Sequence, residues 1–121
     1  MINVVEISGT LTTDVKLSDV GTDLVRAEFT VAVPSVRYDR RAGADVIETA
    51  FIRVVAWEVP AEVAGGLHKG CSAWVRGELV QQEVEVTRGR KERKTSVRAS
   101  VINPLRVTRS TPAPEDDYPT F

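Results

Sequence analysis

Residues 49–57 read TAFIRVVAW, and their side chains alternate in character with a period of two. This is the period of a β-strand, in which successive side chains point to opposite faces. The even positions are alanine, isoleucine, valine and alanine, which suit the interior of a barrel. The odd positions include Phe51, Arg53 and Trp57, so the other face carries two aromatic rings and a cation. The segment therefore predicts a strand with one face in the core and a second face suited to binding.

Four other segments show the same alternation and are expected to be strands. They are residues 5–11, 25–33, 71–79 and 95–101. Residues 21–23 (GTD) have the composition of a turn before the second of them. Val84 and Val86 continue the alternation and can extend the strand of residues 71–79. Residues 88–91 (RGRK), which follow, have the composition of a polar hairpin tip between the last two strands.

Only residues 60–64 (PAEVA) read as a helix. Proline is favoured at the first helical position, and the glycines at 65 and 66 end the segment. The order is three strands, a short helix and two strands. This order predicts an all-β, five-stranded Greek-key barrel of the OB type, with one short helix between strands three and four. A small β-sandwich is the competing architecture, but it gives no particular reason for the position of the helix.

The composition is typical of one soluble domain. The chain has 121 residues, 16 basic and 17 acidic, and a net charge of −1. No apolar run approaches the roughly 18–20 residues of a membrane span, and the first six residues lack the features of a signal peptide, so we expect a cytoplasmic protein. Residues 1–109 carry a net charge of +2 and residues 110–121 a net charge of −3. We therefore expect a domain at 1–108 and a short, flexible acidic tail at 109–121.

The sequence offers little for catalysis. One cysteine, Cys71, and one histidine, His68, cannot form a zinc site or a disulfide framework. Cys71 lies in the apolar register of its strand, and His68 lies at the predicted helix end, where carbonyl oxygens suit it. No carboxylate pair or phosphate-binding glycine loop stands out. We therefore expect no enzyme activity, no catalytic residues, no metal and no cofactor.

Two basic segments accompany the aromatic strand. The first, residues 37–41 (RYDRR), contains Arg37 and Tyr38 and lies between strands two and three. The second is the hairpin tip, where Arg98 follows a cluster consisting of Arg88, Arg90, Lys91, Arg93 and Lys94. Basic runs are usually solvated loops, but beside an aromatic sheet face they favour binding of single-stranded nucleic acid, whose bases stack on rings. On the residues alone, Phe51 and Trp57 suit a helix contact or a subunit contact equally well.

The tail combines acids with aromatic residues. It contains Glu115, Asp116, Asp117, Tyr118, Pro119 and Phe121. Three interpretations stay open at this point: docking into a pocket of a partner protein, competition with nucleic acid for the basic groove, and an unstructured solubilising end.

Taken in order, these segments resemble the bacterial single-stranded DNA-binding protein family. The matching pieces are NVV at 3–5, GTLTTD at 9–14, FTVAV at 29–33, ETAFIRVVAW at 48–57, AEVA at 61–64, LHKG at 67–70 and VRGEL at 75–79. The resemblance implies an OB fold and cofactor-free binding of single-stranded DNA during replication, recombination and repair. It also implies homo-oligomers, commonly tetramers, and an acidic tip that recruits replication and repair proteins.

The resemblance also assigns residues. Phe51 and Trp57 match aromatic stacking positions, and Arg53 and Lys69 match basic contact positions. Arg37 aligns with a further stacking position, with Tyr38 one residue away. Trp74 matches a position typical of a subunit contact.

The chain also departs from the family pattern. The departures are Val15, Val80, Gln82, Val84, a short spacer before the tip, and Thr120 between Pro119 and Phe121. They favour a paralogue that binds more weakly than a main replicative member. Two alternatives remain: an OB-fold interaction subunit of a nucleoprotein assembly and an RNA-binding OB module.

Overall fold

The computed structural model describes residues 1–19 and 25–106. The turn predicted at 21–23 and the tail predicted at 109–121 lie outside these residues. The elements, in chain order, are β1 (Val5–Leu11), β2 (Lys16–Asp19), β3 (Val25–Asp39), β4 (Ala44–Trp57), α1 (Glu58–Ala64), β5 (Ser72–Thr87) and β6 (Arg90–Arg106). No helix within the described ranges has the length and apolar character needed to cross a membrane.

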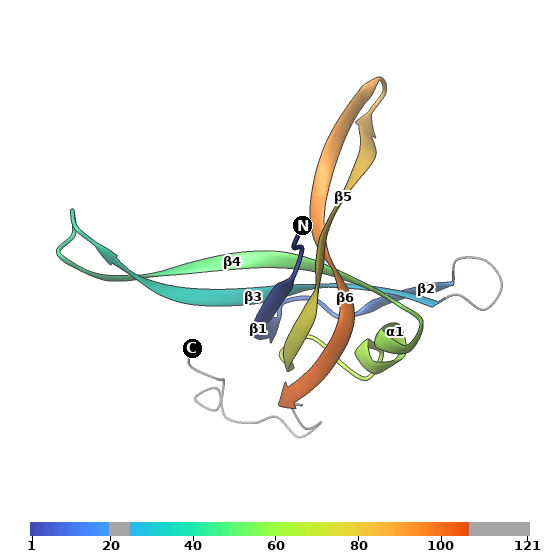
Figure 1. Ribbon diagram of the computed structural model, residues 1–121, viewed down its shortest axis with the longest axis horizontal. Helices are drawn as coiled ribbons and strands as arrows, with labels where there is room; N and C mark the ends of the chain where they lie inside the picture. Colours follow the sequence, from blue (N-terminus) through green and yellow to red (C-terminus); the bar gives the residue numbers. More distant parts are fainter. Residues whose placement is uncertain (20–24, 107–121) are drawn as a thin grey trace.

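The strands form one sheet in the order β1-β5-β6-β4-β3-β2, which closes on itself because β1 also pairs with β3 (Figure 1). Five strands, β1 and β3 to β6, make the barrel, and the helix lies between its third and fourth strands. The predicted five-stranded barrel is therefore confirmed.

The strand β2 was not predicted. Residues of β1 pair with β3 at Val31 and Ala32, whereas β2 pairs with β3 from Val25 to Glu28. The two strands thus follow one another along the same edge of β3. Four residues, KLSD, are too short a segment for alternation to show in the sequence.

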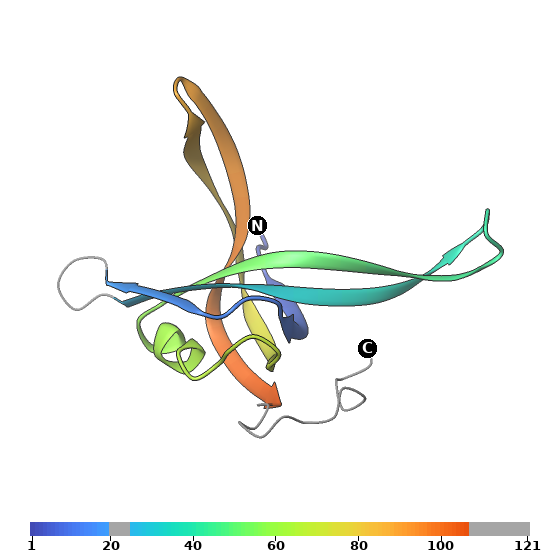
Figure 2. The ribbon, with the colours of Figure 1, turned by 180° about the vertical axis from the view of Figure 1, so that it is seen from behind.

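The β3–β4 hairpin is longer than its alternating segments indicate, whereas β5 continues through Val84 and Val86 as their alternation indicated. The β3–β4 hairpin and the β5–β6 hairpin both extend beyond the barrel, and they leave it in different directions (Figures 1 and 2). The prediction that residues 37–41 lie between strands is therefore wrong for residues 37–39, which include Arg37 and Tyr38 and belong to β3. Their neighbouring strand supplies backbone hydrogen bonds, so a strand continues here although both of its faces are largely exposed. The tips turn at Gly43 and Gly89, whose positive φ angles of 64° and 84° favour glycine.

The core lies between the inner faces of the strands. Its largest fully buried side chains include Phe29, Leu11, Val31 and Val54. The helix begins at Glu58, two residues earlier than predicted, and buries Ala61 and Ala64 against the barrel.

Cys71 and His68, the two residues considered for catalysis or metal binding, both contact the protein itself. Cys71 is fully buried, as predicted. The Nδ1 atom of His68 lies 2.9 Å from the carbonyl oxygen of Lys69.

Candidate nucleic-acid interface

The register of β3 and β4 brings the aromatic and basic residues of 49–57 onto one surface. In an antiparallel pair, residues directly opposite each other point to the same side of the sheet. Trp57 lies opposite Arg26, Arg53 opposite Thr30, and Phe51 opposite Ala32. The intervening residues face the core. We call the following set the outer face: Arg26, Glu28, Thr30, Phe51, Arg53, Val55 and Trp57.

Phe51 is the most accessible ring of the outer face. Its side chain is 67% exposed, which is unusual for a phenylalanine on a barrel strand. Trp57 is partly buried, and the guanidinium carbon of Arg26 lies 5.8 Å from its ring centroid, within cation–π range. One ring is therefore open to solvent, and the other carries a cation over one of its faces.

Glu28 links the two arginines of the outer face. Its Oε1 accepts a hydrogen bond from Nε of Arg53 at 2.6 Å, and its Oε2 accepts one from Nη1 of Arg26 at 2.9 Å. Lys16 lies directly opposite Glu28 on β2. The hydrogen bond from Arg53 lowers the pKa of the Glu28 carboxyl below its usual value of 4.5; partial burial opposes this shift and Arg26 adds to it. Sequence reasoning missed Glu28 and Arg26, because only the register of β3 against β4 reveals that they adjoin Arg53 and Trp57.

The lowered pKa of Glu28 predicts a pH-dependent contribution to stability. The folded protein holds the Glu28 proton less tightly than the unfolded chain, so this contribution is complete above pH 4.5 and is lost as the pH falls through the lower folded pKa. We expect wild type to exceed Glu28→Gln in free energy of unfolding at neutral pH, and the difference to shrink as the pH falls from about 5 into the acid range below the lowered pKa of Glu28. Urea unfolding of both proteins at several pH values measures this. A difference that stays constant over that range would contradict the assignment.

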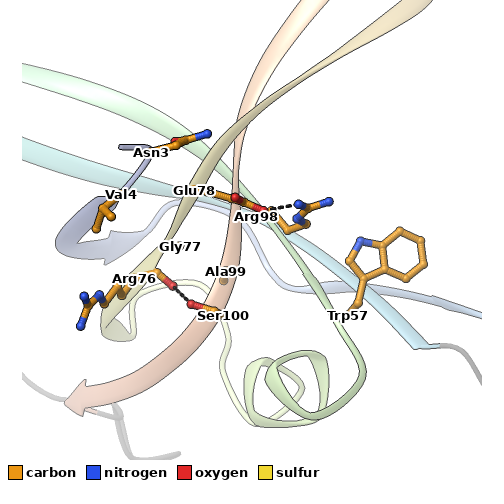
Figure 3. A pocket seen from close by; sticks show the side chains of 9 residues that line it. All are labelled: Asn3, Val4, Trp57, Arg76, Gly77, Glu78, Arg98, Ala99 and Ser100. Atoms are coloured by element: carbon orange, nitrogen blue, oxygen red, sulfur yellow. Dashed lines mark hydrogen bonds and ion pairs between the residues drawn. The ribbon is translucent and has the colours of Figure 1, made fainter. Parts of the chain in front are cut away.

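The outer face continues across β6 and β5. Val55 pairs with Arg98 of β6, and Arg98 lies opposite Glu78 of β5, to which its Nη2 donates a hydrogen bond. Beside this ion pair lies a groove of about 440 Å³ with Trp57 at one end (Figure 3). Its lining residues are Asn3, Val4, Trp57, Arg76, Gly77, Glu78, Arg98, Ala99 and Ser100. Arg98 was predicted to belong with the hairpin tip, but the structure places it at the barrel beside Trp57.

In the distal part of the β3–β4 hairpin, the predicted binding residues Tyr38 and Arg37 point to opposite sides of the sheet. Tyr38 is 61% exposed and lies on the same side of the hairpin as Phe51, six positions along β3 from the residue opposite that ring. Arg37 points to the other side, where its Nη2 lies 2.8 Å from Oε1 of Glu48. Tyr38 therefore extends the aromatic surface, and Arg37 does not.

The remaining basic candidates do not lie on the outer face. Lys69 is exposed in the loop between α1 and β5, where its backbone N–H donates to Oδ1 of Asp14 at 2.9 Å. The tip bases Arg88, Arg90, Lys91, Arg93 and Lys94 lie along the projecting β5–β6 hairpin. The register places Glu83 and Glu85 of β5 opposite two of these bases. With Glu92, three acids accompany the five bases, so the tip is less positive than the basic run in β6 indicates.

Comparison with known proteins places the chain among single-strand binding proteins. Its structure resembles that of a deletion mutant of the single-stranded DNA binding protein from Thermus aquaticus, with a TM-score of 0.76 and 28% sequence identity. That match covers 86% of this chain and 50% of the Thermus chain, so this chain spans half the length of the Thermus protein. It also resembles a Plasmodium falciparum single-strand binding protein solved with single-stranded DNA, with a TM-score of 0.80 and 17% identity over 87% of this chain and 96% of that chain.

Among curated protein sequences, none matches the chain. The model of the single-strand binding protein family matches residues 2–105, which include every element of the barrel except the last residue of β6. With this match, the chain belongs to the single-strand binding protein family.

Proposed function

We propose that the chain binds single-stranded DNA across the outer face, without regard to base sequence. Membership of a family of non-enzymatic DNA-binding proteins supports this function and the expectation that the chain is not an enzyme. The observation that carries the proposal is the exposed ring of Phe51 in line with Arg53 and Trp57 on one strand of the barrel. Bases stack on Phe51 and Trp57, and the guanidinium groups of the outer face bind phosphates. Stacking contributes about 1–3 kcal/mol per base and accepts every base, because every base has a π-face.

Residues outside the outer face extend the DNA path in this proposal. Tyr38 offers a further ring along the β3–β4 hairpin, and Arg37, Lys69 and the tip bases attract phosphates at longer range. Such attraction raises the association rate more than it fixes the position of the strand. The resulting function is protection of exposed single strands during replication, recombination and repair.

Two further features of the proposal come from the family resemblance. The chain assembles as a homo-oligomer, commonly a tetramer in this family. The tail residues 115–121, in which three acids precede an aromatic end, recruit replication and repair proteins. The compartment that fits this role is the cytoplasm, where the chromosome of a bacterium lies.

Equilibrium titration with a poly-dT oligonucleotide tests the proposal. We expect the affinity to fall as salt rises, with a slope of log K against log salt of about −0.7 per contacted phosphate. A double-stranded oligonucleotide of the same length is expected to bind far more weakly, because its paired bases cannot stack on Phe51. Equal binding of the duplex, or a salt-independent affinity, would contradict the proposal. Competition with poly-U distinguishes an RNA-binding module, and no binding to any of the three favours a protein-interaction subunit.

A further inference from the structure

The carboxylate of Glu28 lies between the two arginines of the outer face. It is on the outer face between the two aromatic positions, and its side chain is only 27% exposed. It accepts hydrogen bonds from Arg53 and Arg26, and Lys16 stands opposite it on β2. Two arginines from β3 and β4 therefore contact one carboxylate, and Lys16 of β2 is its register partner.

Carboxylate and phosphate oxygens are alternative acceptors for the same guanidinium donors. We propose that Glu28 is an internal substitute for a DNA phosphate, so that single-stranded DNA binds the outer face by exchanging a phosphate oxygen for this carboxylate at Arg53 and Arg26. The inference rests on the proposed function and adds the residue that sets its affinity.

The same exchange also affects the stacking of bases on Trp57. Arg26 bonds to Glu28 and also lies over the ring of Trp57, 5.8 Å from its centroid. When a phosphate draws Arg26 away from this position, one face of the indole becomes available to a base. One acid thus controls both a phosphate contact and a stacking contact.

Glu28 differs from the other acid near this surface. Among the residues that the structure describes, Glu78 forms an ion pair with Arg98 alone, and its side chain is 41% exposed. Glu28 pairs with two arginines and is less exposed, so its competition with phosphate is less weakened by water. Because Arg53 and Arg26 already bind the Glu28 carboxylate in the free protein, the free energy of displacing this carboxylate reduces the net affinity for a DNA phosphate.

The test compares Glu28→Gln with wild type in poly-dT titrations. Glutamine keeps the shape and the hydrogen-bonding oxygen but removes the charge. We expect roughly threefold to tenfold tighter binding, from the loss of a charge repelling a phosphate several ångströms away. We also expect the salt slope to steepen by about 0.7, because the wild-type carboxylate takes up a cation when it is displaced.

Glu48→Gln is the matched control. Glu48 pairs with Arg37 at a similar distance of 2.8 Å but on the opposite side of the β3–β4 hairpin. The Glu48→Gln substitution removes the same charge from the protein as Glu28→Gln. We expect the affinity of this variant for poly-dT to stay within about twofold of wild type, because both charges of the Glu48–Arg37 pair are exposed and screened. Thermal unfolding of each variant checks that the barrel is intact.

A double-mutant cycle separates exchange from simple repulsion. If Glu28 and phosphate compete for Arg53, then Arg53→Gln costs little affinity in wild type and several-fold more in the Glu28→Gln background. Equal costs in the two backgrounds, or a Glu28→Gln affinity no higher than that of Glu48→Gln, would overturn the exchange and leave single-stranded DNA binding in place. Absence of poly-dT binding by wild type and all variants would overturn both.

Discussion

Replacement of Phe51 by alanine is expected to lower the affinity for poly-dT by roughly tenfold to a hundredfold, the equivalent of about 1–3 kcal/mol for one stacked base. The ring is 67% exposed, so it contributes little to the core and its loss leaves the barrel folded. Titration with the oligonucleotide, together with thermal unfolding, measures both properties.

Ile47→Ala is the control for Phe51→Ala. Ile47 lies on the same side of the same strand and is also 67% exposed, but it has no π-face. We expect its replacement to change the affinity by no more than about twofold. Equal losses for the two variants would show that apolar area, and not stacking, holds the strand.

Tryptophan emission offers a second measurement of the same surface. The chain has two tryptophans, and Trp74 lies on β5, where its Nε1 donates to Oε1 of Glu6 at 2.8 Å. In Trp74→Phe the remaining indole is Trp57, and poly-dT is expected to quench it. In Trp57→Phe the remaining indole is Trp74, and emission is expected to stay nearly constant. Quenching of Trp74 alone would show that DNA binds at β5 and not at β4.

The second large effect is expected at Gly9, where the barrel closes. A Cβ at this position would lie 2.1 Å from the carbonyl oxygen of Ala32 on β3 and 2.8 Å from Cγ1 of Val31. Backbone cannot withdraw from such a contact without breaking the pairing of β1 with β3. We expect Gly9→Ala to lower the free energy of unfolding by roughly 3–5 kcal/mol, as measured by urea unfolding.

Gly66→Ala is the control for Gly9→Ala. The atom nearest to its added Cβ is the carbonyl oxygen of Val63 at 3.6 Å, an ordinary contact. Its effect is expected to stay within about 1 kcal/mol. A stable Gly9→Ala protein would show that β1 can move away from β3 without loss of the fold. Gly77, whose Cβ would lie 2.0 Å from the carbonyl oxygen of Arg98, provides a second site for the same test.

Patterns within single segments of the sequence were sufficient to predict the five strands of the barrel and much of the candidate interface. The alternation in residues 49–57 separated the core side from the side with Phe51 and Trp57 because a strand has a fixed period of two. The glycines after residue 64 marked the end of the helix for a similarly local reason. Where neither face of a strand is buried, as in the distal part of the β3–β4 hairpin, burial does not impose alternation, so the end of β3 was predicted too early and the start of β4 too late.

The sequence by itself therefore determined which residues form the barrel and which side chains of β4 face away from its core, because these depend on periodicity within one segment. Only the tertiary structure decided that Glu28 and Arg26 adjoin Arg53 and Trp57, that Arg98 lies beside the groove, and that the tip bases project away from the rings. These relations depend on the register between strands far apart in the chain. Register is defined by two paired strands, so the sequence of one strand alone does not determine it.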